Sequence, residues 1–261
     1  MNILVTGGNG FIGSHLVERY LQERQKPTII DVRTKNELQR TVSKQARSFV
    51  LPAEDPRCEA VFADSSYDLV VHLACLPLPL LKSENYSKVL QANLAALGNI
   101  LFLAHKFTVP KIIVLFDYRI YGTQQTPMIP EESELNPDCE TGRQEVMREE
   151  YCEAYRRQGL QVVSLRTGII YGETPSWHND PIKQQLLFQQ GKPDPKQIDS
   201  NPSWQKNDVQ LKFSASDALN ADYLFIYDLI EAIIRVGENQ TSPILNIGSG
   251  RLFNAAAIQA V

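Results

Sequence analysis

Up to about residue 165, the chain alternates short apolar runs with longer stretches that are apolar on one face. Each run has the length of a β-strand and is mostly continuous in valine, isoleucine and leucine, which is typical of strands buried on both faces of a sheet. The runs are Ile3–Val5, Thr28–Ile30, Phe49–Leu51, Leu69–Leu73, Lys111–Leu115 and Val162–Leu165. Strands that alternate with helices favour crossover connections, so the pattern predicts a parallel α/β sheet.

The stretches between these runs predict helices of two kinds. Leu16, Val17, Tyr20 and Leu21 recur at helical spacing, which predicts a helix that covers the sheet. Asn85–Phe107 is apolar on more than one face. One sheet cannot cover all of these faces, so we expect self-association, as a homodimer, through this helix. Arg143–Gln158, the second candidate helix for that interface, has a single apolar stripe.

Composition narrows the class of protein. The chain has 261 residues, 43% of them hydrophobic, which is enough for one full core. A net charge of −4 without a Lys/Arg run argues against nucleic acid as a partner. No signal-like leader and no apolar run of about 20 residues is present, so we expect a soluble cytoplasmic protein with no membrane contact.

The four cysteines are not spaced as metal or redox motifs. Cys58, Cys75, Cys139 and Cys152 never form the C-x-x-C pair of a zinc ribbon or redox site. We therefore expect no metal and interpret all four as reduced packing residues.

A glycine-rich loop follows the first strand and precedes the first helix. Gly7, Gly10 and Gly13 stand three apart, and Asp31 ends the second strand 18 residues later. In dinucleotide sites such glycines allow a tight turn, a close approach to pyrophosphate and close packing of the helix, whose N-terminus binds the anion. Asp31 can accept hydrogen bonds from a ribose diol and would repel a 2′-phosphate, which favours NAD over NADP; Arg33 weakens this preference slightly. The predicted cofactor residues are Gly7, Asn9, Gly10, Phe11, Ile12, Gly13, Asp31, Arg33, Leu73, Ala74 and Asn93.

Further motifs follow in a characteristic order. They are GGNGFIG at 7–13, HLAC at 72–75, Asn93, IYG at 120–122, LR at 165–166, YG at 171–172 and LNIGSG at 245–250. As a set they resemble the extended short-chain dehydrogenases, the NAD-dependent nucleotide-sugar epimerases and dehydratases, from Met1 to about Gly250. The resemblance implies NAD as cofactor, a nucleotide sugar as ligand and a Rossmann-type, doubly wound parallel sheet. It also implies an NAD-binding domain over 1–171 and a small, partly truncated cap over 172–261, in which about 222–250 returns to the main sheet.

The catalytic residues of these relatives are replaced. The relatives use a Ser or Thr before the IYG motif and a Tyr-x-x-x-Lys turn, in which the lysine lowers the pKa of the tyrosine. The matching positions here hold Asp117, Thr141 and Glu145, and no Tyr-x-x-x-Lys occurs anywhere in the chain. Glu145 would place a negative charge where the relatives carry a positive one. Ala221 stands where the relatives carry an arginine that binds the substrate diphosphate.

Other candidate residues allow two interpretations each. Asp117 and Glu145 could share a proton as a recruited acid–base pair, or Asp117 could simply cap the next turn. Tyr118 and Tyr121 could reach the same cleft, although packing is the preferred interpretation for both. His72 is expected to be a hydrogen-bonded core histidine. Trp177 and His178 could touch a ligand or only cover the cap.

Three functions remain open at this stage. The chain could bind NAD without turnover, as a binding or regulatory protein of this family. It could be an active sugar-nucleotide epimerase, dehydratase or reductase that uses Asp117, Glu145, Tyr118 or Tyr121. It could also be a non-catalytic dimerisation module. Whether NAD binds, and whether it is then reduced, separates the three.

Overall fold

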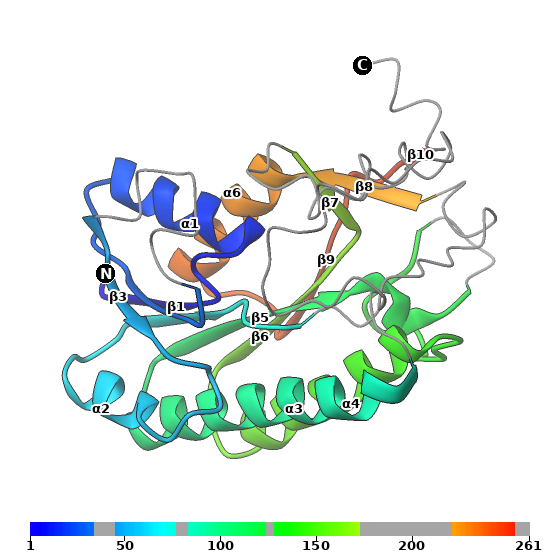
Figure 1. Cartoon of the computed structure of the whole chain (residues 1–261). Coiled ribbons are helices and arrows are strands. Elements are labelled where there is room, and N and C mark those ends of the chain that lie inside the picture. The colour runs from blue at the N-terminus through cyan, green and yellow to red at the C-terminus, as the bar shows by residue number, and fades with distance from the viewer. Residues whose placement is uncertain (34–44, 77–82, 124–127, 173–220, 254–261) are drawn as a thin grey trace, which may run out of the picture.

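The computed structural model describes residues 1–33, 45–76, 83–123, 128–172 and 221–253. These residues form a sheet with helices on both faces (Figure 1). The main sheet consists of β1 (Ile3–Thr6), β2 (Thr28–Asp31), β3 (Arg47–Val50), β4 (Leu69–His72), β5 (Lys111–Asp117), β6 (Val162–Thr167) and β9 (Ile244–Ile247). The described helices are α1 (Phe11–Gln22), α2 (Cys58–Ala63), α3 (Ser83–Lys106), the 3-10 helix η2 (Tyr118–Tyr121), α4 (Glu140–Arg156) and α6 (Ile226–Glu238).

The strand order confirms the predicted doubly wound fold. The seven strands are parallel and lie in the order β3-β2-β1-β4-β5-β6-β9. The chain moves outward from β1 to β3 and then returns to place β4 on the other side of β1. In open α/β sheets, ligands bind beyond the carboxyl ends of the strands at such a reversal. The loops after β1 and β4 therefore flank the expected crevice.

All six predicted strands form, but their burial differs. The central strands β1, β2 and β4 are buried along their whole length. The expectation of burial on both faces is wrong for β3, whose residues are half-buried or exposed. The physical reason is position, because β3 is an edge strand, and among the described residues only β2 pairs with it. A second sheet, in the order β10-β8-β7, contains β7 (Ile169–Tyr171), β8 (Ala221–Phe225) and β10 (Leu252–Phe253).

The two faces of the main sheet carry separate cores. α1 and α6 cover one face, and α2, α3 and α4 cover the other (Figure 1). Helix α3 buries Leu97, Ile100 and Leu101 completely and leaves Phe102 49% exposed. By length and composition Tyr86–Lys106 could span a membrane, with 39% of its window buried. The buried helix of a soluble core meets the same criterion, and α3 packs on the sheet as such a helix.

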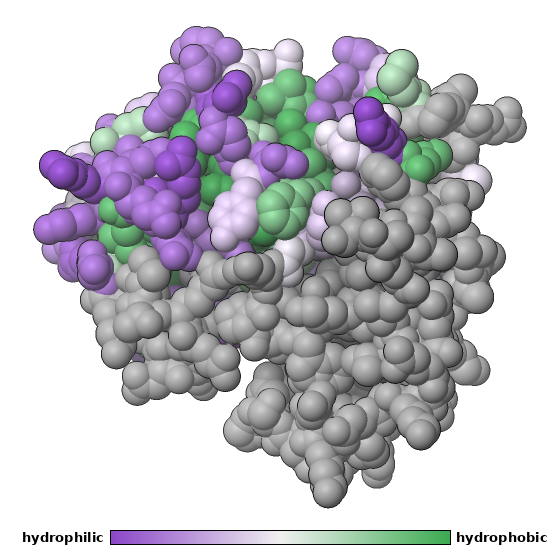
Figure 2. Space-filling view, turned by 90° about the horizontal axis from the view of Figure 1, so that it is seen from above, coloured by the Kyte–Doolittle hydropathy of each residue, from purple (hydrophilic) through white to green (hydrophobic). Residues whose placement is uncertain are grey.

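The outer surfaces of the two helical layers differ. Figure 2 looks down on the α1 and α6 layer, where hydrophilic residues are prominent among smaller apolar areas. One ion pair, between Arg19 of α1 and Glu231 of α6, joins these helices, and the same two residues also pair along their own helices with Glu23 and Arg235. The opposite layer exposes large apolar side chains on α3 and α4, namely Phe102, Met147 and Tyr151.

The cysteines are free, but only two of them are core residues. Cys58 and Cys152 are fully buried in the core beneath α2, α3 and α4. The packing interpretation is wrong for the other two. Cys139 is half-buried and its Sγ accepts a hydrogen bond from the Gly142 amide at the start of α4, and Cys75 is exposed in the loop after β4. Within the described residues, no cluster of His, Cys, Asp and Glu has the geometry of a metal site.

Candidate functional site

The glycine loop is tightly folded between β1 and α1. Gly7 has φ +70°, in the left-handed region that favours glycine. A Cβ on Gly13 would lie 2.2 Å from the Gly7 carbonyl oxygen. The helix can therefore approach the loop this closely only with glycine at position 13.

The N-terminus of α1 suits an anion. Gly10 is the N-cap residue, no side chain among the described residues caps the helix, and its first turn contains no acidic residue. The helix N-terminus carries partial positive charge and exposed amide groups, so it attracts phosphate groups. Phe11 and Ile12 begin the helix and are half-buried. These observations fit the pyrophosphate of a dinucleotide.

Asp31 is held in place at the carboxyl end of β2. Its two carboxylate oxygens accept hydrogen bonds from the backbone amides of Asn9 and Arg33, each at 2.8 Å. The Asn9 side chain also donates to the Arg33 carbonyl at 2.7 Å. The arrangement fixes the glycine loop relative to β2 and fits a ribose diol.

The loop after β4 forms the other wall of the crevice. The Leu73 amide donates to the Thr6 carbonyl at 3.0 Å, and a Cβ on Gly7 would lie 2.8 Å from the Ala74 nitrogen. Asn93 on α3 holds the end of this loop, because its side chain accepts from the Leu76 amide at 2.7 Å and donates to the Leu76 carbonyl at 2.9 Å. The loops after β1, β2 and β4 and the α3 residue Asn93 are therefore linked by contacts at the carboxyl ends of these strands.

The positions that match the relatives' tyrosine and lysine lie at the start of α4. Thr141 is half-buried and Glu145 is 3% exposed. Glu145 forms an ion pair with Arg148 at 2.6 Å, and both side chains are 4% exposed. Arg148 also donates to the Leu115 carbonyl and lies over the Phe116 ring. The carboxylate at this position is therefore one half of a buried ion pair with Arg148, so its negative charge is balanced within the fold.

Asp117 is bound to an arginine of its own. Its carboxylate accepts from the Arg119 amide at 2.9 Å and from two guanidinium nitrogens of Arg119 at 2.8 and 2.6 Å, so that Asp117 caps η2. Among the described residues, no hydrogen bond joins the Asp117 and Glu145 side chains. Burial raises the pKa of Glu145, Arg148 opposes this effect, and Asp117 raises the pKa further. Asp117 and Glu145 each pair with an arginine, and they lie close enough for the charge and the backbone of Asp117 to act on the Glu145 carboxyl.

The tyrosines near Asp117 differ from each other. Burial, with a contribution from the Asp117 charge, raises the pKa of Tyr118 to about 12, so this phenol is harder to ionise than usual. Tyr121 is 2% exposed. Its hydroxyl donates to Asn246 at 2.8 Å and accepts from Arg166 at 2.5 Å. Tyr121 therefore packs, as the sequence favoured.

His72 is a buried residue at the end of β4. Its Nδ1 lies 2.8 Å from the Thr6 hydroxyl, and its Nε2 has no hydrogen-bond partner in the described part of the chain. Burial lowers the pKa of His72 to about 3, and the nearby Arg148 contributes to the same direction. The imidazole is therefore neutral at physiological pH.

Sequence reasoning missed several buried polar residues on α4. Gln144, Arg148 and Glu149 are all buried, and Glu149 pairs with Arg166 of β6 at 2.5 Å. Together with Glu145 they occupy positions 144, 145, 148 and 149, which lie on one face of a helix. This spacing is a signal that sequence analysis could have used. Polar residues on the inward face of a helix indicate a hydrogen-bonded network inside the fold.

Two further expectations concern the substrate side. Ala221, which matches the relatives' arginine, is 2% exposed and pairs with Phe253 between β8 and β10. An arginine introduced at this position would enter a buried strand. Trp177 and His178 lie outside the described residues.

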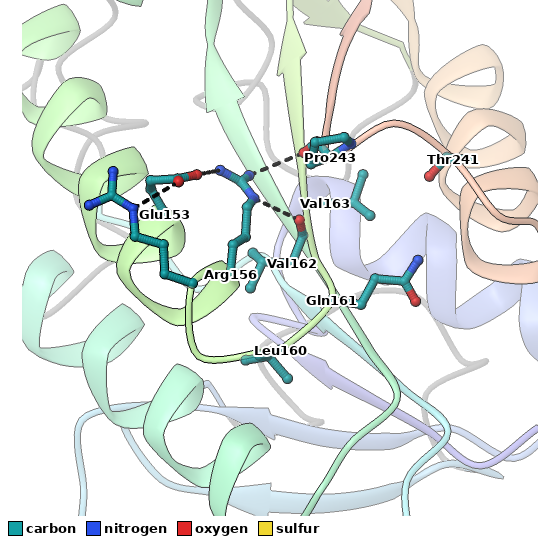
Figure 3. A pocket seen from close by; sticks show the side chains of 9 residues that line it. Glu153, Arg156, Leu160, Gln161, Val162, Val163, Thr241 and Pro243 are labelled. Atoms are coloured by element: carbon teal, nitrogen blue, oxygen red, sulfur yellow. Dashed lines mark hydrogen bonds and ion pairs between the residues drawn. The ribbon is translucent and has the colours of Figure 1, made fainter.

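A cavity of about 480 Å³ lies at the opposite end of the sheet, where β6 begins (Figure 3). Arg156 of α4 crosses it and donates to the carbonyl oxygens of Val162 and Pro243. This end is remote from the carboxyl ends of the strands, where ligands bind in such folds. We therefore assign these arginine contacts to the attachment of α4 to the sheet.

Known proteins share this architecture. A curated relative, a putative UDP-glucose 4-epimerase of Methanocaldococcus jannaschii, is 26% identical over 253 residues, which cover 95% of this chain and 77% of that protein. UDP-glucuronic acid decarboxylase 6 of Arabidopsis thaliana is 25% identical over 263 residues, covering 95% and 69%. Among solved structures, the Thermus thermophilus UDP-glucose 4-epimerase complex with NAD has a TM-score of 0.80 at 23% identity, covering 100% of this chain and 81% of that one.

The family itself is identified by a longer match. The model of the NAD-dependent epimerase/dehydratase family matches residues 3–248, from the first residue of β1 to the glycine after β9. This range includes the glycine loop, Asp31, the loop after β4 and the altered positions on β5 and α4. The chain belongs to the NAD-dependent epimerase/dehydratase family.

Proposed function

We propose that this protein binds NAD in the crevice between the loops after β1 and β4, with a nucleotide sugar beside it, and catalyses little or no hydride transfer. The binding half of the proposal is supported by the glycine loop, by the uncapped start of α1 and by the fixed Asp31 carboxylate. NAD, when bound, supplies a hydride acceptor. The protein must supply the base that removes the proton from the sugar hydroxyl.

The ion pair between Glu145 and Arg148 supports the second part of the proposal, that the protein catalyses little or no hydride transfer. A tyrosine phenol ionises near pH 10 and needs a fixed positive charge beside it to act as a base near neutrality. Here the matching hydroxyl belongs to Thr141, and the matching cation is replaced by Glu145, neutralised at 2.6 Å by Arg148. Asp117 is held by Arg119, and Tyr118 is harder to ionise than a free phenol.

Absorbance near 340 nm tests this proposal. We expect purified protein to bind NAD in calorimetry and to form no NADH band with UDP- or dTDP-sugars. Robust turnover that survives Asp117→Ala and Glu145→Gln would refute it. Turnover that both substitutions abolish would instead establish the recruited carboxylates as catalytic residues, and absence of NAD binding would favour a dimerisation module.

We also propose that the protein forms a homodimer in the cytoplasm through α3 and α4. The support is the group of exposed apolar side chains on these two helices, Phe102, Met147 and Tyr151. We expect light scattering at micromolar concentration to give twice the 29.5 kDa chain mass. Tyr151→Glu should reduce it to the single-chain value, and Tyr227→Glu, at an exposed tyrosine of α6, should leave it unchanged. A single-chain mass for the unmodified protein would contradict the proposal.

A further inference from the structure

A hydrogen-bonded chain connects α4 to the loop after β4. Asn93 holds both polar groups of the Leu76 backbone, so its amide orientation is fixed, with Oδ1 toward the Leu76 amide. Its second N–H donates to Gln144 Oε1 at 2.8 Å. Gln144 Nε2 in turn donates to Glu145 at 3.2 Å.

The same chain continues to β5 through the ion pair. Glu145 accepts from Arg148 at 2.6 Å, and Arg148 donates to the Leu115 carbonyl at 3.2 Å. Asn93, Gln144, Glu145 and Arg148 are each 3% exposed or less. Water competes little for these hydrogen bonds, and loss of one partner leaves a buried polar group unsatisfied.

Gln144 links the two parts of this hydrogen-bonded series. It is the residue that joins the clamp on Leu76 to the ion pair of Glu145 and Arg148. The relatives' Tyr-Gly-Arg-Ser-Lys sequence has serine at this position, and a serine side chain is two heavy atoms shorter than glutamine along the path from Cβ to the polar atom. The replaced residues of α4 thus form a support for a loop.

The loop in question lies on one side of the proposed dinucleotide site. Asp31, on the β2 side of β1, fits the adenosine ribose, and a dinucleotide crosses the point of strand reversal toward β4. The loop from Leu73 to Leu76 therefore faces the nicotinamide half. Its start touches Gly7, and its end is held by Asn93.

We infer that Gln144 is a positioning residue, which acts through Asn93 to fix the loop after β4 and so sets the affinity of the site for the nicotinamide half of a dinucleotide. This inference rests on the proposed function for its ligand. Its structural part, the coupling between Gln144 and Leu76, stands on the hydrogen bonds alone.

Gln144→Met tests the inference, because methionine keeps the length of glutamine and removes both hydrogen bonds. We expect hydrogen exchange at the Leu76 amide to accelerate about 5- to 10-fold and NAD affinity to fall about 5-fold, the effect of one net hydrogen bond. Affinity for ADP, which lacks the nicotinamide half, should change less than about twofold. Gln91→Met, at an exposed glutamine of α3, is the matched control and should change none of these values.

A double variant tests whether the effect passes through Asn93. In an Asn93→Ala background, Gln144→Met should produce no further loss, because residues in one network are not additive. Unchanged exchange at Leu76, additive losses, or equal losses of NAD and ADP affinity would each overturn the inference. If the unmodified protein binds neither nucleotide, the proposed function and the ligand part fail together, and exchange at Leu76 still decides the coupling.

Discussion

The glycine loop keeps the relatives' sequence pattern, whereas the first turns of α4 depart from it. In the loop, Gly7 and Gly13 still allow the close backbone approach that an anion site needs. On α4, Thr141 and Glu145 stand at the positions that match the relatives' tyrosine and lysine. Arg148 forms an ion pair with Glu145. The loop thus has the backbone geometry that an anion site needs, whereas the matched positions on α4 hold a threonine and a paired carboxylate.

The difference follows from what each region requires. An anion site at a helix N-terminus depends on backbone amides and on the absence of side chains, so it persists as long as the fold and the glycines do. A base depends on one ionisable group and one neighbouring charge. Such a base can be lost by two substitutions without disturbing the fold, provided that the new buried charges are paired.

The largest effect is expected from Glu145→Lys. This change places two cations together inside the protein, so the free energy of unfolding should fall by about 3–5 kcal/mol in denaturant titrations. Adding Arg148→Met should recover at least half of the loss. Glu140→Lys, at an exposed position of the same helix, should cost less than about 1 kcal/mol. A Glu145→Lys protein as stable as the unmodified one would contradict the buried pair.

The same pair decides how activity could be restored. Asp117→Ser, Thr141→Tyr and Glu145→Lys together recreate the relatives' residues, and the structure adds Arg148→Met to relieve the new charge. We expect this fourfold variant to show at most a weak NADH band at 340 nm, against none for the unmodified protein. Ala221→Arg is better left out, because it enters a buried strand.

Gly13→Ala should damage the opposite region. The new Cβ would lie 2.2 Å from the Gly7 oxygen and 2.7 Å from Gly8 Cα, both backbone atoms of the loop. We expect NAD affinity in calorimetry to fall about 100-fold or more, with a stability loss of about 1–3 kcal/mol from overpacking. Gly98→Ala on α3, where the nearest atom is 3.3 Å away on the half-exposed Tyr151 ring, should leave NAD affinity unchanged. Equal effects of the two changes would contradict the tight loop.

Acid should destabilise the protein through His72, which lies between the two regions. The unfolded chain binds a proton at His72 near pH 6.5, whereas the folded chain does so only near pH 3. Stability is therefore lost as pH falls from about 6.5, by about 2 kcal/mol at pH 5.

The raised pKa of Glu145 has the opposite effect on stability, because the folded chain binds a proton at Glu145 more readily than the unfolded chain does. The contribution of His72 is therefore measured as a difference in pH dependence between two proteins. His72→Asn should remove this part of the pH dependence in denaturant titrations at pH 5 and 7. His105→Asn, at the exposed end of α3, should keep it. An identical pH dependence in the unmodified and His72→Asn proteins would show that His72 ionises normally in the fold.

The smallest effect concerns the choice between NAD and NADP. Unmodified protein should bind NAD more tightly, because Asp31 meets a ribose diol and repels a phosphate. Asp31→Asn removes the charge and should reduce the preference about tenfold, whereas Asp64→Asn at an exposed aspartate should not. Calorimetry that shows equal or better NADP affinity for the unmodified protein would contradict this interpretation.

Much of the fold could be predicted because its signals are local. Runs such as Ile3–Val5 and Lys111–Leu115 have strand length and composition, and β1 and β5 form there. The glycine spacing likewise predicted a tight turn between β1 and α1, and Gly7 and Gly13 form one. The exposure of β3 could not be predicted from its own residues, because it depends on which strands pair with it.

The ion pairs and hydrogen bonds of the site could not be predicted, because the partner residues come from other elements of the fold or from the next turn of the same helix. The sequence drew attention to Asp117 and Glu145, but it did not show that each of them forms an ion pair with an arginine. The partner of Glu145 is three residues away, and the pair extends to Asn93 and Leu115 on other elements. Cys139 shows the same limit, since its role as a cap appears only with the start of α4.

The sequence by itself determined the doubly wound sheet, the glycine loop and the absence of a Tyr-x-x-x-Lys motif, because these follow from periodicity and from residue identity at fixed spacing. Only the tertiary structure decided that Glu145 is neutralised, that His72 stays uncharged and that Gln144 reaches the loop after β4. The reason is physical: the charge and the hydrogen bonds of a buried group are set by the atoms that replace water around it, and these come from several elements of the fold.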